Sequence, residues 1–467
     1  MRLSRLHVAV LATLPAVFLV GCPGETKKSF PFPATPVQAA GSSSSSGDNQ
    51  TGIAGQALAL PFVVQVVDTL GGPVEGVAVD WAMVSGGGTV TVPHTVSDKK
   101  GLAQTSVILG PKAGANVFAA TVDGNGGVRT ITFQATGTAG PPAVVTILSG
   151  DGQTGSTGST LPGALVVTVS DAIGNPCTSS VTFTSSNGSS VNPSVTQTNN
   201  QGQAQTFLTL GSATGDVFVR ATIVVNGGQL VTAVFHENAV PAGAFRTVFL
   251  SNPTSTTAGT TLSSFQVGLV DQFGNIVTTA TNPITVGMGN NPTGSALNGT
   301  LTVAPTNGVA TFSTLSINGA GANYTLVATS TGPAASASAP FDIVAAGPNQ
   351  VAFAVQPTNA TAGQPFATAV QVRVLDAFGN IANTAQPITI SLGNNTSGAT
   401  LSGTTMANAV AGTAVFNNLS VDRVQGTQYV LTATSPGVIA ATSNGFSIVA
   451  ATAAKLVVTG QPAAAQT

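Results

Sequence analysis

Residues 166–175 read Val-Val-Thr-Val-Ser-Asp-Ala-Ile-Gly-Asn, an apolar run that ends in a turn. The same pattern, an alternating apolar run followed by D-x-x-G-[N/G], occurs four times, with its Asp at positions 68, 171, 271 and 376, every 100 to 105 residues. Self-similarity at a fixed period indicates a repeat architecture. We expect the motif to form a structural turn built from Asp68, Gly71, Asp171, Gly174, Asn175, Asp271, Gly274, Asn275, Asp376, Gly379 and Asn380.

Two further markers follow each turn in a constant order, a G-x-A triplet and an alternating strand that ends in Ala-Thr. Three markers in one order, four times over, exclude chance. The last residues, from Ala454, resemble the opening of the fourth repeat. The predicted division is a signal peptide (1–22), a tether (23–32), repeat one (33–139), repeat two (140–240), repeat three (241–346), repeat four (347–451) and the start of an incomplete fifth repeat (452–467).

Short runs rich in Val, Ile, Thr and Phe alternate with Gly, Asn and Pro turns, and no stretch has a capped helical apolar period. This pattern predicts an all-β chain of tandem immunoglobulin-like antiparallel sandwiches of Greek-key type, arranged as an extended rod. Val77-Ala-Val-Asp-Trp81 alternates cleanly and contains the only Trp. We expect large core side chains at Trp81 and at its predicted counterparts Phe183, Met288 and Leu392. The alternative is an exposed Trp81 that stacks on a ligand.

The composition excludes several classes of protein. Only 13 Lys and Arg and 15 Asp and Glu occur in 467 residues, with a net charge of −2, so there is no field that would attract nucleic acid. With 42% apolar residues the chain is not disordered through low hydrophobicity. Its two Cys, Cys22 and Cys177, leave no pair for a disulfide once Cys22 is lipidated. We expect Cys177 to be a small buried apolar residue, and a reactive thiol is the alternative.

The N-terminus has the features of an export signal. Arg2 and Arg5 precede an apolar stretch, Val8 to Val20, which is shorter than the roughly 20 residues that span a bilayer. It ends in Leu-Val-Gly-Cys22, which resembles the lipobox of bacterial lipoproteins. The resemblance implies acylation of Cys22, anchoring in a membrane through lipid, and an outer-membrane or cell-surface location. An ordinary secretory signal is the alternative.

Repeats one and two resemble the bacterial immunoglobulin-like domains of the invasin and intimin type. The matching segments are Gln-Thr-Gly at 50–52, Val-Val-Asp-x-x-Gly-Gly-Pro-Val-x-Gly-Val-x-Val at 66–79, and Gly-Leu-Ala at 101–103. Repeats three and four are more divergent, and the resemblance covers roughly residues 33–451. It implies the fold and a role as spacer, adhesive tip or module beside an enzyme, but it does not transfer receptor binding.

The candidate chemical groups favour structure over catalysis. The turn Asp could bind calcium, but calcium needs several converging oxygens and acids are scarce around Asp271 and Asp376. The three His are far apart in the sequence, so we expect no metal, no catalytic residue, no cofactor and no enzyme activity. Gly-Asp-Gly-Gln-Thr-Gly at 150–155 matches a dinucleotide motif, but no helix can follow it. Tyr324 and Tyr429 are expected in the core with bonded hydroxyls, or alternatively as sugar-stacking platforms.

Together these features predict a monomeric, lipid-anchored stalk or adhesin, about 150 Å long at ~3.3 Å per strand residue. Its expected partners are the membrane, through the lipid, and glycans or other surface proteins. One alternative is that the repeats space a catalytic or carbohydrate-binding domain beyond the C-terminus. Another is a specific ligand site in the loops at 86–88 or 289–291.

Overall fold

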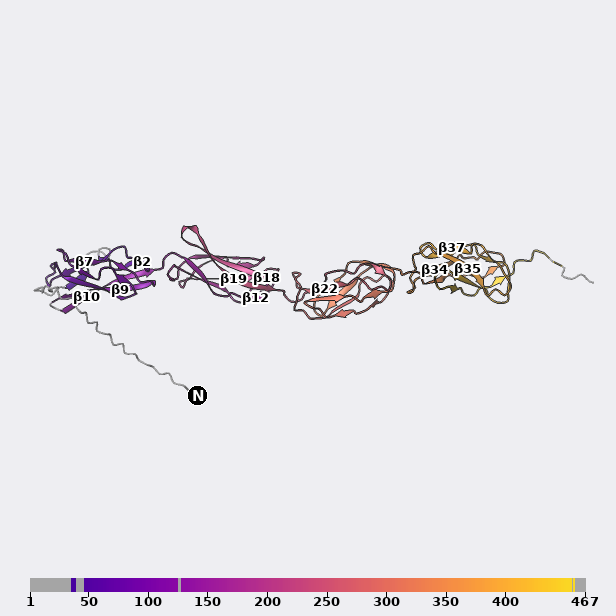
Figure 1. Ribbon diagram of the computed structural model, residues 1–467, viewed down its shortest axis with the longest axis horizontal. Coiled ribbons are helices and arrows are strands. Elements are labelled where there is room, and N and C mark those ends of the chain that lie inside the picture. Colours follow the sequence, from indigo (N-terminus) through magenta and orange to yellow (C-terminus); the bar gives the residue numbers. More distant parts are fainter. Residues whose placement is uncertain (1–34, 39–45, 125–126, 456, 458–467) are drawn as a thin grey trace, which may run out of the picture.

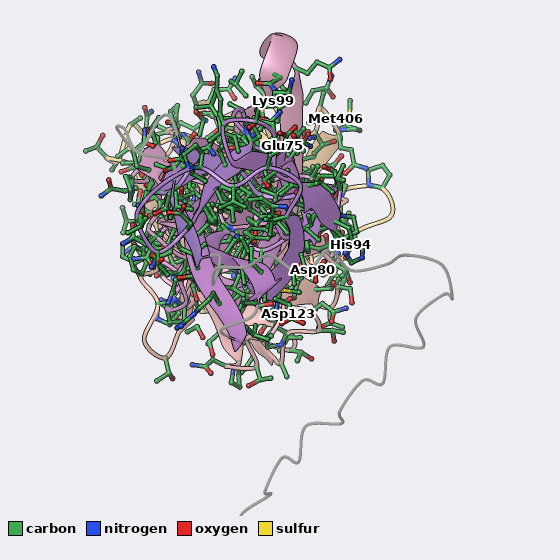
Figure 2. All side chains as sticks on the ribbon, turned by 90° about the vertical axis from the view of Figure 1, so that its left-hand side faces the viewer. Glu75, Asp80, His94, Lys99, Asp123 and Met406 are labelled. Carbon is green, nitrogen blue, oxygen red and sulfur yellow. The ribbon has the colours of Figure 1, made fainter. Side chains whose placement is uncertain are left out.

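The computed structural model describes residues 35–38, 46–124, 127–455 and 457. Figure 1 shows four β-sandwiches placed end to end in sequence order, and in Figure 2, seen along the long axis, they lie behind one another. Four separate apolar clusters fill them, with buried members between Leu58 and Ala135, Val145 and Ala239, Ala258 and Ile343, and Val351 and Ile448. Each repeat therefore closes its own core. The predicted signal peptide, Cys22 and the tether lie outside the described residues.

The strands of repeats one and two form two main sheets per repeat, and repeat one has a further two-stranded sheet made of β5 and β8. In repeat one they are β1 (Thr35–Gln38), β2 (Gln50–Ile53), β3 (Phe62–Val67), β4 (Ala78–Ser85), β5 (Thr89–Val90), β6 (His94–Val96), β7 (Leu102–Thr105), β8 (Val107–Ile108), β9 (Gly114–Gly124) and β10 (Gly127–Thr138). In repeat two they are β11 (Val144–Ser149), β12 (Thr154–Ser156), β13 (Leu165–Ser170), β14 (Ser180–Ser185), β15 (Ser190–Asn192), β16 (Val195–Gln197), β17 (Gln203–Thr209), β18 (Gly215–Val224) and β19 (Leu230–Val240), with the short 3-10 turn η1 (Asn226–Gly228) between the last two.

Repeats three and four have shorter strands in the same order. Repeat three contains β20 (Arg246–Phe249), β21 (Thr256–Thr257), β22 (Phe265–Val270), β23 (Ile284–Met288), β24 (Leu297–Asn298), β25 (Thr302–Val303), β26 (Val309–Phe312), β27 (Ser316–Ile317), β28 (Gly321–Tyr324), β29 (Leu326–Ser330), β30 (Ser336–Ala337) and β31 (Phe341–Val344). Repeat four contains β32 (Gln350–Val355), β33 (Ala360–Thr361), β34 (Val370–Leu375), β35 (Pro387–Gly393), β36 (Leu401–Ser402), β37 (Met406–Asn408), β38 (Thr413–Phe416), β39 (Ser420–Val421), β40 (Val430–Thr434), β41 (Ala441–Thr442) and β42 (Ile448–Val449).

The sheet topology is that of an immunoglobulin-like sandwich. In repeat two the sheet orders are β11-β13-β17-β15 and β12-β19-β18-β14-β16. The first two strands of the repeat are edge strands of different sheets, because β11 pairs antiparallel with β13 while β12 pairs parallel with β19. The same division occurs in repeat one, where β1 pairs with β3 and β2 pairs parallel with β10. The predicted fold class is confirmed.

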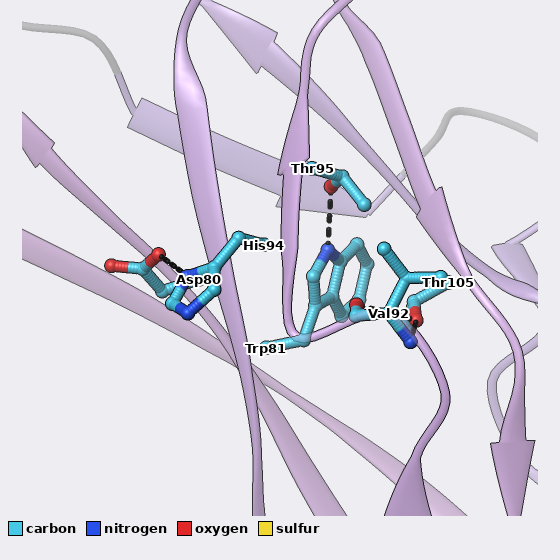
Figure 3. Close-up of polar contacts among 6 residues, drawn as sticks. All are labelled: Asp80, Trp81, Val92, His94, Thr95 and Thr105. Atoms are coloured by element: carbon cyan, nitrogen blue, oxygen red, sulfur yellow. Dashed lines mark hydrogen bonds and ion pairs between the residues drawn. The ribbon is translucent and has the colours of Figure 1, made fainter. Parts of the chain in front are cut away.

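Alternation places the core as expected. Along β13, Leu165, Val167 and Val169 are buried while the residues between them are only partly covered, because successive side chains of a strand point to opposite faces. Trp81 is 3% exposed, and its indole Nε1–H donates to Thr95 Oγ1 at 2.8 Å (Figure 3). The ring is therefore a core side chain with its polar atom satisfied, and it is not available for ligand stacking.

The register corrects two predicted counterparts of Trp81. Trp81 pairs with Ala120 and Phe183 pairs with Ala221, the Ala of the Ala-Thr marker. The residues that pair with this marker in the next two repeats are Val286 and Ile390, not Met288 and Leu392. Met288 and Leu392 lie two positions further along the strand, on the same face. They are only partly buried and pack against the edge of the core. The size of the side chain did not identify this position, because it is aromatic in repeats one and two but holds the smaller aliphatic residues Val286 and Ile390 in repeats three and four.

Among the described residues, no helix is long and apolar enough to cross a membrane. The described part of the last segment, residues 452–455 and 457, contains no strand, and the rest of the predicted fifth repeat lies outside the described residues.

Candidate interdomain junctions

The D-x-x-G-[N/G] motif forms a closed turn at one end of each repeat. In repeat three, Asp271 Oδ1 accepts the backbone N–H groups of Phe273 and Asn275, both at 2.9 Å. Gly274 has a φ of 94°, a conformation that glycine adopts without strain. The same two carboxylate bonds close the turns at Asp68, Asp171 and Asp376.

The second carboxylate oxygen ties the turn to the linker that enters the repeat. Asp271 Oδ2 accepts the N–H of Ala242 at 3.2 Å and the hydroxyl of Thr157 at 2.8 Å, and Thr157 belongs to repeat two. One carboxylate thus joins the turn, the linker and the preceding repeat. The matching linker bonds are Gly140 N–H to Asp171 Oδ2 and Ala346 N–H to Asp376 Oδ2, both at 2.9 Å.

The Asn of the turn reaches across the junction. One N–H of its side-chain amide donates to the turn carboxylate, and the other donates to a backbone carbonyl of the preceding repeat. These interdomain bonds are Asn175 to Pro111 at 2.9 Å, Asn275 to Ser212 at 2.7 Å and Asn380 to Asn318 at 2.7 Å. At two junctions the amide oxygen also accepts a backbone N–H, from Ala113 at 2.7 Å and from Ala320 at 2.9 Å.

The third turn residue makes the apolar contact of each junction. It is Ile173, Phe273 or Phe378, and it lies against a glycine at the far end of the preceding repeat, which we call the end glycine. A Cβ placed on the end glycine would lie 3.2 Å from Ile173 Cδ1 at Gly55, 2.7 Å from Phe273 Cζ at Gly158 and 2.1 Å from Phe378 Cζ at Gly259. The end glycines leave room for the third turn residue.

Burial and hydrogen bonding act in opposite directions on the turn carboxylates. Burial raises the pKa of Asp271, but the bonds from Asn275, Thr157 and Ala242 outweigh it and hold the pKa at about 2. The pKa values of Asp171 and Asp376 are also lowered, since the bonds from their own Asn and linker amides again outweigh burial. All three carboxylates are at most 4% exposed. They are charged anions that accept hydrogen bonds from the turn and the linker.

The two outer ends of the four described repeats differ from the three junctions. The turn of repeat one has Gly72 in place of Asn, and its third residue, Leu70, is 92% exposed. At the other end, a Cβ on Gly363, the end glycine of repeat four, would meet no described atom within 4 Å. The interdomain Asn is therefore present in each turn that meets a preceding repeat.

The other candidate groups lie apart from one another. His94 and Asp80 form an exposed pair on repeat one, with Nδ1 and Oδ1 2.7 Å apart (Figure 3). Cys177 is 3% exposed, and burial followed by the charge of Asp171 raises the pKa of its thiol. Within the described residues no group of three or more His, Cys, Asp or Glu could hold a metal ion.

Tyr324 and Tyr429 are fully buried, so neither ring can stack on a sugar. The Tyr324 hydroxyl donates to the Gly319 carbonyl at 2.8 Å, and the Tyr429 hydroxyl donates to the Arg423 carbonyl at 2.9 Å. In the loop at 86–88, Gly88 is buried and a Cβ on it would lie 2.6 Å from the Phe118 ring, whereas Gly86 and Gly87 are exposed. Both Tyr side chains have a structural role.

Glu237 is a buried carboxyl that the sequence analysis missed. It is 2% exposed, its Oε2 accepts the Gln153 N–H at 2.5 Å, and its Oε1 has no partner among the described residues. Burial raises the pKa of Glu237 to about 7. The bond from Gln153 lowers this pKa, and the charge of Asp151 raises it further. The strand register identifies the matching positions as Ala135, Phe341 and Phe446. A polar residue at a position that is apolar in the other repeats was the available signal.

The fold and its junctions define the class of protein: a tandem array of immunoglobulin-like domains joined by charged turns. Among solved structures, similarity is found to FdeC, an Escherichia coli adhesin, with 18% identity, a TM-score of 0.36, and coverage of 68% of this chain and 96% of that one. Invasin, a bacterial integrin-binding protein, is 13% identical with a TM-score of 0.34 and coverage of 89% and 78%. The extracellular cadherin domains 3–6 of protocadherin gammaB7 are 11% identical, with a TM-score of 0.36 and coverage of 86% of this chain and 97% of that one.

No family model matches the sequence, and no curated protein matches it. At these identities and TM-scores the structural likenesses do not extend to function, and the fold assignment rests on the strand order of the chain itself.

A pair of glycine substitutions tests the apolar contact of the junction. Gly259 and Gly363 have similar φ values, 74° and 77°, so Ala at either position carries similar backbone strain. Only at Gly259 would the new Cβ displace the Phe378 ring. We expect Gly259→Ala to widen the distribution of spin-label distances between repeats three and four, and Gly363→Ala to leave it unchanged. Equal distributions in the two variants would contradict the contact.

Proposed function

We propose that the protein is an exported, lipid-anchored surface stalk of adhesin type. The observation that carries the proposal is the repetition of one junction three times, each with a buried Asp, a bridging Asn and an apolar contact. A junction with directional bonds fixes the orientation of neighbouring domains, so that four small sandwiches can act as one extended spacer. A spacer of this kind holds its far end away from the membrane.

The surface supports a non-catalytic role. Charged residues make up 6% of the sequence, and in Figure 2 the exposed Asp123 lies on the opposite side of the end of repeat one from Glu75 and Lys99. Such a surface forms many weak polar contacts, and we propose glycans or other surface proteins as its partners. We propose that the protein acts as a monomer and carries no cofactor.

Small-angle scattering of residues 23–467 tests the stalk. We expect an elongated monomer with a maximum dimension of about 150 Å, on the basis of ~3.3 Å per strand residue. A compact particle would contradict the proposal, as would a broad ensemble of bent shapes.

Metabolic labelling with an alkyne fatty acid tests the anchor. The wild-type protein should incorporate the label, and Cys22→Ala should not, because the residue that carries the acyl chains is gone. Several acyl chains on one Cys make a stable membrane anchor. Cys177→Ala is the matched control, since that thiol is buried, and it should label like the wild type. Surface exposure is then scored with a C-terminal epitope on intact cells. If the wild-type protein were exported but carried no label, the lipid anchor would be wrong and the protein would be secreted.

A further inference from the structure

Each repeat has two different ends. The near end carries the turn with its Asp, third residue and Asn, and the far end carries the end glycine and the backbone groups that the next Asn binds. At the junction of repeats three and four, the far end consists of Gly259, the Asn318 carbonyl and the Ala320 N–H. Because the two ends differ, the contact is head to tail, and it leaves one far end uncovered in the described array.

The uncovered far end belongs to repeat four and keeps the local structure of the covered ones. The Gly363 N–H donates to the Val421 carbonyl at 2.9 Å, as the Gly259 N–H donates to the Ile317 carbonyl at 2.9 Å. Asp422 and Val424 follow Val421 as Asn318 and Ala320 follow Ile317. Neither the Asp422 carbonyl nor the Val424 N–H has a hydrogen-bond partner among the described residues.

The side chains around this end leave its backbone open. The Asp422 carboxylate accepts the Thr400 N–H at 2.7 Å, and the Arg423 guanidinium donates to the Ser397 carbonyl at 3.3 Å, both within repeat four. Val424 is 48% exposed, whereas its counterpart Ala320 at the covered end is half-buried, so apolar surface is exposed at this end. The loop is one residue longer than in repeat three, and the extra residue precedes Tyr429.

We propose that the far end of repeat four is a docking surface for a further immunoglobulin-like domain that carries an Asp-x-Phe-Gly-Asn turn. The Phe covers Gly363, the Asn donates to the Asp422 carbonyl and accepts the Val424 N–H, and the Asp accepts the N–H of Ala451. Ala451 follows Val449 at the spacing at which Ala346, the linker residue bound by Asp376, follows Val344. The three occupied junctions supply this geometry.

The near end of a second copy of the chain fits less well. Its exposed Leu70 could cover Gly363, but Gly72 stands where the other turns have Asn. A second copy would therefore lack the side-chain amide that bridges each existing junction. For this reason the proposal names a domain with a complete turn rather than repeat one.

A five-domain chain tests the proposal. Residues 23–451 are followed directly by a second copy of residues 347–451, so that Val449-Ala-Ala451 precedes the added domain as Val344-Ala-Ala346 precedes repeat four. Tethering is used because a linked domain docks at millimolar effective concentration even when its free affinity is low. Spin labels in repeat four and the added domain should give a distance distribution as narrow as that for labels in repeats three and four.

Matched variants then locate the contact. Gly363→Ala should widen the distribution at least two-fold, and so should Asn380→Ala in the added copy. Gly437→Ala in repeat four is the control, because Gly437 also has a positive φ (71°) and open space around it, and it should leave the width unchanged. A broad distribution in the parent chain would overturn the proposal, as would equal widths in Gly363→Ala and Gly437→Ala.

Self-association of the four-repeat chain is the competing outcome. If analytical ultracentrifugation showed concentration-dependent association that both Leu70→Ser and Gly363→Ala abolished, the surface would belong to a second copy and the proposed occupant would be wrong. A monomeric four-repeat chain together with a rigid five-domain chain supports the proposal.

Discussion

Asp271→Ala is expected to free the junction between repeats two and three and to destabilise repeat three by about 3–5 kcal/mol. The carboxylate accepts bonds from two turn amides, the Asn275 side chain, the Thr157 hydroxyl and the Ala242 N–H. It is fully buried, so its loss leaves several donors without a partner. Hydrogen exchange of repeat-three peptides in denaturant measures the loss, and spin labels across the junction measure the loosening.

Asp68→Ala is the matched control. Asp68 accepts the same two turn amides, from Leu70 and Gly72, but its turn has no Asn that bridges to another repeat. We expect a smaller loss of about 1–2 kcal/mol, confined to repeat one, with no change at any junction. Equal losses in the two variants would show that Asp271 acts only within its own turn.

The same carboxylate makes the junction sensitive to acid. The folded pKa of Asp271 is about 2, below its ordinary value of 3.8, so the stabilisation is complete above about pH 4 and is lost as the pH falls towards 2. At pH 2 about half of the Asp271 side chains in the folded protein are protonated, so the wild-type junction should be partly loosened there, between its state at neutral pH and that of Asp271→Ala.

Glu237→Gln is expected to stabilise repeat two at pH 8 by about 3 kcal/mol and to remove a pH dependence. The folded pKa of Glu237 is about 7, above its ordinary value of 4.5, so the folded state holds the proton more tightly. In the wild type, stability is then greatest below pH 4.5 and falls as the pH rises through 7, by about 1.4 kcal/mol per unit of pKa difference. Gln is neutral throughout and can still accept the Gln153 N–H.

Hydrogen exchange of β18 and β19 peptides between pH 5 and 8, corrected for intrinsic rates, measures this dependence. Glu75→Gln is the matched control, because Glu75 is exposed on repeat one, and it should change nothing in repeat two. If wild-type repeat two were equally stable at pH 5 and pH 8, Glu237 would not be the neutral buried acid that its surroundings indicate.

Much of the fold could be read from local pattern. Alternating runs such as Leu165 to Ser170 bury one face whatever the neighbouring repeat does, and the recurring Asp-Gly pair specifies a tight turn. The error at Met288 and Leu392 came from ranking residues by size, when strand pairing places Val286 and Ile390 beside the Ala-Thr marker. Size varies between repeats, but the register does not.

The junctions were harder to predict because their residues look unremarkable in isolation. Ile173, Phe273 and Phe378 stay about half exposed, so no periodicity marks them as buried. The signal was positional: a glycine 12 or 13 residues before each Asp, and an Asn that is missing from the first turn. That spacing shows that a position recurs, but it does not identify the partner.

The amino-acid sequence by itself determined four autonomous β-sandwiches, their length and their turns, because strand alternation and turn chemistry act within some ten residues. Tertiary structure alone decided that the turn Asp and Asn join one repeat to the next, and that Glu237 is buried without a full set of partners. The reason is physical: these contacts link residues about 60 to 115 positions apart, and only the folded backbone brings their donors and acceptors within 3 Å of each other.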